Sequence, residues 1–199
     1  MPPASWFDDM KRSAASWSKA LTRYQGLIYL DLETTSQFPD SADIVQIGIL
    51  SHDGKVLINQ LVNPGKPIPP ESTKIHRITD DDVTSSPTFA EIYPELKSLI
   101  NGKMVVIYNA NYDSQILQYH CETAKLPPFR PERWIDAMQP VSEFVGNWNA
   151  RYKSFKWVKL TEVADQLKVS LDGAHDALVD CHLTRGVLKA MAEWADTCE

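Results

Sequence analysis

The N-terminal segment 5–24 has the hydrophobic spacing of an amphipathic helix. Apolar side chains recur at steps of three or four residues, which places them on one helical face: Trp6, Met10, Ala14, Trp17, Leu21 and Tyr24. Ser5 and Asp8 are spaced to form a capping box at the start of this helix, with aspartate in place of the usual glutamate. We interpret residues 1–25 as an N-terminal amphipathic extension that packs on the following domain. A helix that binds a partner protein is the alternative.

Three short extended patterns follow this segment. The runs 27–33, 44–51 and 55–62 are rich in Ile, Leu and Val and are bounded by turn-forming residues, which predicts three strands. His52-Asp53-Gly54 separates the last two runs and is typical of a hairpin turn. We therefore expect an antiparallel meander at the start of the domain.

After a proline-rich connection, the pattern changes to alternating helices and strands. Ser86 and Pro87 resemble an N-cap followed by proline at the first helical position, which predicts a helix to about Ile100. Strands are expected at 103–108 and 134–137, and helices at 112–124, near 140, at 160–168 and at 175–194. The predicted fold class is α/β: a mixed sheet, antiparallel in its first three strands and then parallel, with helices on both faces.

Composition and charge narrow the function classes. The chain has 199 residues and a net charge of −6, which argues against a protein that coats nucleic acid through a large basic surface. No apolar run is long enough to cross a membrane, and the N-terminus lacks the layout of a signal peptide, so we expect no membrane association and a cytoplasmic location. Cys121, Cys181 and Cys198 form no CxxC pair and are interpreted as free thiols.

Two carboxylates share one face of the first predicted strand. Asp31 and Glu33 are two residues apart, so their side chains point to the same side. An isolated pair of this kind is usually a strand end that faces solvent. Two further carboxylates elsewhere in the chain favour a different interpretation.

Asp113 and Asp180 each lie on the apolar face of a predicted helix. Asp113 precedes Ile116 and Leu117 by three and four residues, and Asp180 follows Ala177 by three. A buried carboxylate costs several kcal/mol unless it is paired or bound to a metal, and no lysine or arginine shares either face. Four such carboxylates would also repel one another. Oxygen ligands without a histidine or cysteine pair favour two Mg²⁺ or Mn²⁺ ions.

His175 lies five residues before Asp180, at the expected start of the last helix. A lone histidine is more often a surface or capping residue. Beside a carboxylate cluster, however, it is a candidate general base, because an imidazole can exchange a proton near neutral pH. Asp172-Gly173-Ala174 just before it would form a flexible turn.

Three strings in this chain resemble the exonuclease motifs of the DEDD superfamily: LDLETT (30–35), NANYD (109–113) and HDALVD (175–180). The HxxxxD spacing matches the histidine-type branch, DEDDh or DnaQ-like, which includes the proofreading subunit of the bacterial replicative DNA polymerase. KIHRIT (74–79) resembles the segment between the first two motifs. The resemblance spans about residues 26–194 in the expected order.

This resemblance implies an RNase H-like fold and a 3′–5′ exonuclease domain over residues 26–199. Four carboxylates, Asp31, Glu33, Asp113 and Asp180, would bind two Mg²⁺ or Mn²⁺ ions, with Asp31 between them and His175 as general base. The family positions that line the pocket for the terminal nucleotide correspond to Thr34, Thr35, His76, Asn109 and Tyr112. Tyr108 departs from the family pattern, because many relatives have histidine there.

The implied function is release of nucleoside 5′-monophosphates from nucleic-acid 3′ ends, with DNA favoured over RNA. One alternative is a nuclease for RNA 3′ ends or short oligoribonucleotides. Another is a catalytically idle nucleic-acid-binding module associated with a polymerase. A polymerase or other protein partner could bind through the N-terminal helix. Idleness is disfavoured because all four carboxylates and the histidine are present.

The segment 147–159 interleaves cations with aromatic residues. It contains Arg151, Lys153, Lys156 and Lys159 among Trp148, Tyr152, Phe155 and Trp157. Such a mixture suits phosphate contacts and base stacking along a single strand. The alternative is that the aromatic side chains belong partly to the core and that the lysines form a solvated rim.

Overall fold

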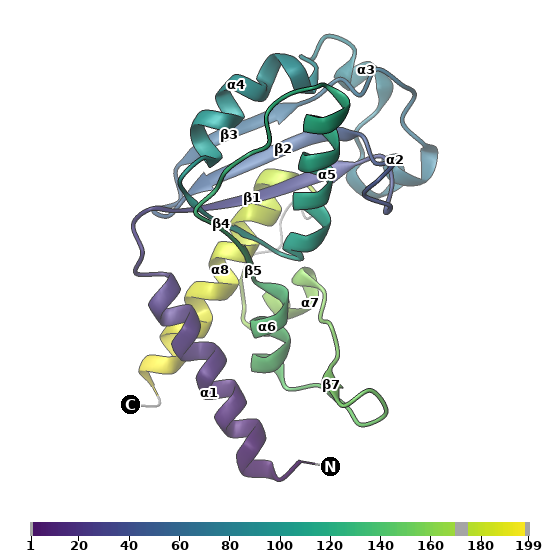
Figure 1. The fold of residues 1–199 in the computed structure, drawn as a ribbon. Coiled ribbons are helices and arrows are strands. Elements are labelled where there is room, and N and C mark those ends of the chain that lie inside the picture. Colours follow the sequence, from purple (N-terminus) through teal and green to yellow (C-terminus); the bar gives the residue numbers. More distant parts are fainter. Residues whose placement is uncertain (1, 170–174, 198–199) are drawn as a thin grey trace.

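The computed structural model describes residues 2–169 and 175–197. Its centre is a five-stranded sheet of order β3-β2-β1-β4-β5 (Figure 1). The strands are β1 (Leu27–Thr34), β2 (Ile44–Ser51), β3 (Val56–Leu61), β4 (Met104–Ile107) and β5 (Arg133–Asp136). β1, β2 and β3 form the predicted antiparallel meander, and β4 and β5 continue the sheet in parallel with β1. The predicted mixed sheet is therefore confirmed.

Helices cover both faces of this sheet. They are α1 (Ala4–Leu21), α2 (Pro70–His76), α3 (Asp80–Val83), α4 (Phe89–Ile100), α5 (Ala110–Thr123), α6 (Met138–Val145), α7 (Leu160–Gln166) and α8 (Ala177–Asp196). Figure 1 shows α4 and α5 on one face and α8 passing behind the sheet, with α1 beside it. A two-stranded hairpin, β6 (Trp148–Asn149) and β7 (Ser154–Phe155), lies between α6 and α7 in the sequence.

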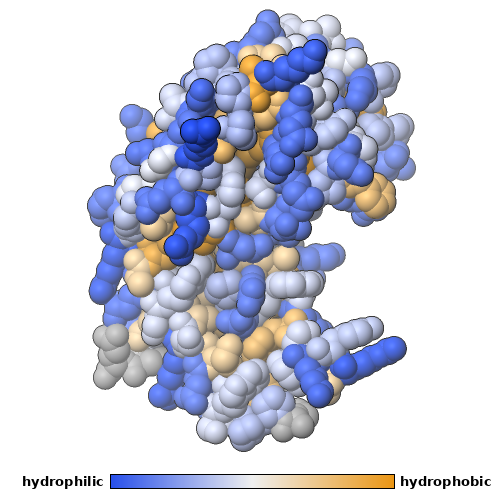
Figure 2. Space-filling view, in the orientation of Figure 1, coloured by the Kyte–Doolittle hydropathy of each residue, from blue (hydrophilic) through white to orange (hydrophobic). Residues whose placement is uncertain are grey.

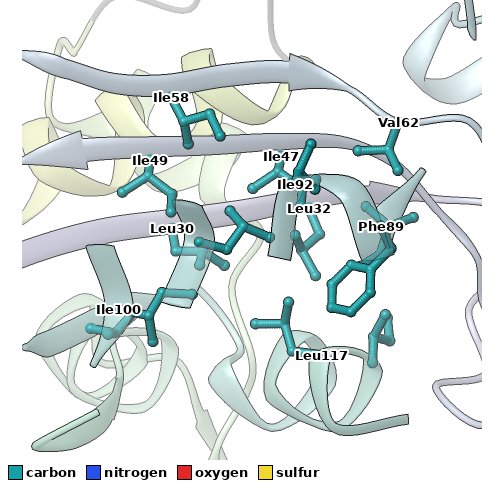
Figure 3. Packing of buried hydrophobic residues seen from close by; sticks show 14 of the residues in the cluster. Leu30, Leu32, Ile47, Ile49, Ile58, Val62, Phe89, Ile92, Ile100 and Leu117 are labelled. Carbon is teal, nitrogen blue, oxygen red and sulfur yellow. The ribbon is translucent and has the colours of Figure 1, made fainter. Parts of the chain in front are cut away.

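Each face of the sheet has its own hydrophobic core. Side chains of alternate positions in β1, such as Leu30 and Leu32, pack with Phe89 and Ile92 of α4 and Leu117 of α5 (Figure 3). The intervening positions face the other core, with α1, α6, α7 and α8. Strands buried on both faces read as continuous apolar runs, which is why a polar residue in β1 is conspicuous.

The N-terminal helix packs against the domain. Ala14, Ala15 and Ser18 of α1 are buried, and the Ser18 hydroxyl donates a hydrogen bond of 2.6 Å to the backbone oxygen of Leu188 in α8. Lys19 forms an ion pair of 2.7 Å with Asp196 at the other end of α8. The capping box predicted from Ser5 and Asp8 is wrong, because the helix begins after Pro3 without a side-chain cap.

Two other predictions are corrected at the middle of the chain. The helix expected after Ser86-Pro87 begins later, at Phe89, because Thr88 and Glu91 form a reciprocal capping box that satisfies each other's backbone N–H groups. The stretch between Pro70 and Val83 contains α2 and α3, which the sequence pattern did not predict.

The remaining predictions concern cysteines and membrane spans. Cys121 and Cys181 are buried free thiols, as expected, and Cys198 lies outside the described residues. Within residues 2–169 and 175–197, no helix is both long and apolar enough to span a membrane.

Candidate active site

Four carboxylates from three elements gather at one end of the sheet. Asp31 and Glu33 come from β1, Asp113 from the first turn of α5, and Asp180 from the first turn of α8. Carboxylate oxygens of Asp31, Glu33 and Asp180 all lie within 4.8 Å of one another. Asp113 is outside this group of three, but its charge acts on Asp31. The four residues that the sequence predicted thus lie together.

Burial raises the pKa of every member of this cluster, and the charges of other members raise the pKa of Asp31 and Glu33 further. Burial is the largest cause in each case. It raises the pKa of Glu33 to about 8 and that of Asp113 to about 8. The pKa of Asp31 is raised well above its ordinary value, first by burial and then by the charges of Asp113, Asp180 and Glu33. The pocket therefore opposes full ionisation of the cluster unless a positive charge enters it.

The donor atoms of the cluster fit a divalent cation. The Oδ1 atom of Asp180 is buried and has no hydrogen-bond partner in the part of the chain that the structure describes. Among the described residues, none of the four carboxylates forms an ion pair with lysine or arginine. Hard oxygen donors that lack a protein counter-charge are the ligands that Mg²⁺ and Mn²⁺ prefer. The cluster accordingly satisfies the chemical requirements for these ions.

His175 lies at the start of α8, beside the carboxylates. Its side chain is exposed and its backbone has a φ of +68°, in the left-handed region. Its charge is close enough to Asp180 to lower the pKa of that carboxyl, against the larger effect of burial. The turn predicted at Asp172-Gly173-Ala174 lies outside the described residues.

Hydrogen bonds between Gln46 of β2 and the start of α8, here called the polar clamp, fix the position of the HDALVD motif (175–180). The Gln46 amide donates to Asp176 Oδ2 at 2.8 Å, and its oxygen accepts from the backbone nitrogen of Ala177 at 3.1 Å. Asp176 Oδ1 in turn caps the helix by accepting from the backbone nitrogens of Leu178 and Val179. These contacts fix the first turn of α8, which carries Asp180.

The clamp requires a very close approach of the helix to the strand. A side chain at Gly48 would place its Cβ 2.6 Å from backbone atoms of Ala177 and Leu178. The sequence pattern did not predict a role for Gln46, Gly48 or Asp176. Only the HDALVD string offered a signal, since an aspartate directly before a helix is a typical N-cap.

The five predicted pocket residues surround the end of β1. The Thr34 and Tyr112 hydroxyls lie 2.6 Å apart, and Tyr112 also donates to the backbone oxygen of Ser36. Thr35 is buried, and its backbone oxygen accepts from Ser72 of α2 at 2.8 Å. The loop after β1 is thereby held between α5 and α2.

His76 and Asn109 complete this region. His76 ends α2, and its Nδ1 accepts from the backbone nitrogen of Ile78 at 3.0 Å, so the neutral ring has its proton on Nε2. That Nε2 atom is buried and has no hydrogen-bond partner among the residues described. Burial lowers the pKa of His76, which favours the neutral ring. Asn109 is the N-cap of α5 with a φ of +72°, a left-handed conformation that asparagine tolerates better than most residues.

Tyr108, which departs from the pattern of many relatives, has a structural partner. Its hydroxyl donates a hydrogen bond of 2.6 Å to the backbone oxygen of Val158. Burial raises its pKa to values beyond the ordinary range of a tyrosine. The contact joins the end of β4, next to Asn109, to the segment that follows the β6–β7 hairpin.

Comparison with known proteins identifies the family. Residues 28–188 match the RNase T family model, described as an exonuclease. The chain is 40% identical to an uncharacterized exonuclease, CP81, of Escherichia phage 186, over 83% of this chain and 88% of the phage protein. It is 27% identical to the DNA polymerase III subunit epsilon of Treponema pallidum (strain Nichols), over 88% of this chain and 80% of that subunit.

A solved structure supports the same assignment. The structure described as Exonuclease X in complex with 5′ overhanging duplex DNA superposes with a TM-score of 0.62 and 25% identity, over 84% of this chain and 92% of that one. The mixed sheet and its flanking helices are thus those of the RNase H-like exonucleases. With its family match, its relatives and its three motifs in order, the chain belongs to the DnaQ-like, histidine-type DEDD family of 3′–5′ exonucleases.

Proposed function

We propose that this protein removes nucleoside 5′-monophosphates one at a time from the 3′ ends of single-stranded DNA. The observation that carries the proposal is the group formed by Asp31, Glu33 and Asp180. One carboxylate oxygen of each lies within 4.8 Å of the others, and within residues 2–169 and 175–197 none of the three forms an ion pair with lysine or arginine. DNA is favoured as the substrate because the related Exonuclease X is described in complex with DNA.

The four carboxylates would hold two Mg²⁺ or Mn²⁺ ions. When bound, these ions would supply the positive charge that neutralises the scissile phosphate and makes water a better nucleophile. The carboxylates suit this role because they are hard oxygen donors, and one oxygen each from Asp31, Glu33 and Asp180 lies within 4.8 Å of the others. Asp31 has the central position, since the charges of the other three all act on it.

His175 is proposed as the general base. It would accept a proton from the water that attacks phosphorus, while the bond from phosphorus to the 3′ oxygen of the preceding nucleotide breaks. Its exposed position beside α8 leaves the imidazole accessible to solvent and substrate. Gln46 and Asp176 act on this step indirectly, because they hold the turn that joins His175 to Asp180.

The terminal nucleotide would lie against Thr34, Thr35, His76, Asn109 and Tyr112. His76 is the clearest contributor, because its buried Nε2–H has no hydrogen-bond partner among the described residues and can donate to a phosphate or sugar oxygen. Tyr112 and Thr34 would shape the pocket through their mutual hydrogen bond.

A protein partner and the cytoplasmic location stay predictions. The Treponema relative is named as a polymerase subunit, so a polymerase is the partner to test. The face of α1 with Ala14, Ala15 and Ser18 is covered within this chain. A partner would therefore bind the exposed face with Asp9, Arg12 and Ser16.

The test of function uses single-stranded DNA, duplex DNA and RNA labelled at either end, with Mg²⁺ or Mn²⁺ and product sizing. We expect a 3′ label to appear at once as mononucleotide and a 5′ label to shorten stepwise. A 3′-phosphorylated strand should resist attack, whereas a 5′ block should make no difference. Release from the 5′ end would reject the polarity, and a strong preference for RNA would replace DNA as the substrate.

A further inference from the structure

The segment 147–159 is divided by the structure into an inner and an outer set of side chains. Trp148 and Phe155 are register partners in the β6–β7 hairpin, and their ring centroids lie 5.2 Å apart. Phe155 stacks parallel to Trp6 of α1, with centroids 5.6 Å apart. These partly buried rings attach the hairpin to the N-terminal helix, so this part of the segment has a structural role.

The outer set is exposed and positively charged. Arg151, Tyr152 and Lys153 form the tip of the hairpin, and Asn149 fixes it by accepting from the backbone nitrogens of Arg151 and Tyr152. Tyr152 is 68% exposed and Trp157 is 65% exposed, unusually high values for large aromatic residues. Segment 147–159 contains four cations and no acid in a chain of net charge −6.

A groove of about 430 Å³ runs beside the hairpin, between it, α1 and α6. Trp157 and Lys153 line one side, and the floor includes Ser142 of α6. Ser142 is 1% exposed, and its hydroxyl has no hydrogen-bond partner in the described chain. In Figure 2, hydrophilic side chains project at the lower right, where Figure 1 places the hairpin, and an apolar patch lies next to them.

The backbone connects this surface to the candidate active site. Trp157 is followed by Val158, whose backbone oxygen accepts the hydrogen bond of Tyr108. Tyr108 directly precedes Asn109, the N-cap of the helix that carries Asp113. The exposed ring of Trp157 thus lies next to Val158, which is hydrogen-bonded to Tyr108 at the end of β4 near the candidate active site.

We propose that residues 148–157, the hairpin arm, bind the unpaired nucleotides that precede the 3′ end of the substrate. Bases stack on Trp157 and Tyr152, and phosphates contact Arg151 and Lys153. This inference rests on the proposed function. Charge complementarity selects a polyanion, and exposed rings require bases that are not paired, which favours a single strand over duplex.

Binding in a chelator separates the arm from catalysis. The probe is a 5′-fluorescent oligo-deoxythymidine of about 16 nucleotides, within the span that one single-strand site covers. We expect Trp157→Ala to weaken binding about tenfold, because stacking on one ring accounts for a substantial part of single-strand affinity. Trp157→Phe should retain most of the affinity, since a phenyl ring still stacks.

The charged tip is tested by Arg151→Ala combined with Lys153→Ala. Its control combines Lys125→Ala with Arg130→Ala, two exposed cations outside the arm, which give the same change in net charge. Loss of two phosphate contacts should lower the slope of log affinity against log salt by about 1.4, at about 0.7 per contact on a single strand. The control pair should leave that slope unchanged.

Hydrolysis of a dinucleotide completes the experiment. All arm variants should cleave it at the wild-type rate with added Mn²⁺, because it has no upstream nucleotides to bind. Equal binding of the oligonucleotide by wild-type and arm variants, or equal losses in the arm and control pairs, would overturn the proposal. Absence of hydrolysis by the wild type would instead reject the proposed function, and the binding data in chelator would still decide the role of the arm.

Discussion

Among single residues, Asp180 most strongly indicates that the site binds a cation. Burial raises the pKa of this carboxyl, and the charge of Asp176 raises it further, while His175 acts in the opposite direction. One of its oxygens is buried and has no hydrogen-bond partner within residues 2–169 and 175–197. A group in such a position destabilises the folded chain until a ligand binds it.

Asp180→Asn should therefore raise the stability of the protein in chelator while abolishing hydrolysis. The amide removes a negative charge from a repelling cluster, and we expect a gain of about 1 kcal/mol in the free energy of unfolding. Urea denaturation measures this change. Asp165→Asn, an exposed position, is the control and should alter neither stability nor activity. A large loss of stability on Asp180→Asn would contradict the electrostatic account.

His175→Ala should lower kcat by about 10² to 10⁴ with little change in KM, because a general base acts in the chemical step. Steady-state kinetics with single-stranded DNA gives both constants. His182→Ala is the matched control, since His182 is exposed on the same helix. If the His175 variant kept the kcat of the wild type, the base would have to be another group.

Site residues could be predicted from the sequence where a charged side chain falls on an apolar face. Asp113 and Asp180 are anions on apolar helical faces, and this conflict is visible in the sequence. Gln46 interrupts the apolar run of β2, but the sequence does not show which residue this polar side chain contacts. Its role arises from a hydrogen bond to Asp176, 130 positions away, which exists only in the folded chain.

Among the contacts between elements, the one between β2 and α8 leaves the least space for an added side chain. Gly48→Ala would place a methyl group 2.6 Å from the helix backbone, so α8 and Asp180 must move away. We expect a loss of about 1 to 3 kcal/mol in stability and a clear loss of activity. Thermal denaturation and kinetics measure the two effects.

Gly26→Ala is the control for this change. Its added methyl group would meet only the side chain of Tyr24, which can move aside. If both alanine variants retained full stability and activity, the close packing of α8 on β2 would not position the active site.

Helices and strands could be predicted from the sequence where they are long enough to show a hydrophobic pattern. The five strands are short apolar runs and the longer helices have a helical hydrophobic period, and the structure confirms these elements. α2 and α3 have seven and four residues, too few for a helical period to emerge. The β6–β7 pairing involves two residues on each strand, and its stability comes from the distant ring of Trp6. Such elements depend on tertiary contacts that a local pattern does not contain.

For the whole molecule, the raised pKa values predict how stability varies with pH in chelator. Glu33 has a pKa raised from its ordinary value of 4.5 to about 8, so the folded state retains a proton that the unfolded state has released. Stability is therefore highest below the ordinary value and declines as the pH rises through about 8. Each retained proton contributes a slope of up to about 1.4 kcal/mol per pH unit.

Urea denaturation over this pH range measures the slope. Asp113 follows the same direction, with a pKa of about 8. Saturating Mg²⁺ should reduce the pH dependence, because a bound cation favours the ionised carboxylates. Stability that rises with pH between about 5 and about 8 in chelator would contradict the raised pKa values.

The most direct test of the central claim is calorimetric titration of Mn²⁺ into the wild type and Asp31→Asn, with hydrolysis followed over the same concentrations. The account predicts two Mn²⁺ ions per wild-type chain and activity that rises as the second ion binds. Asp31→Asn should lose both, since Asp31 lies at the centre of the cluster. Full hydrolysis in chelator, or equal Mn²⁺ binding by the two proteins, would contradict it.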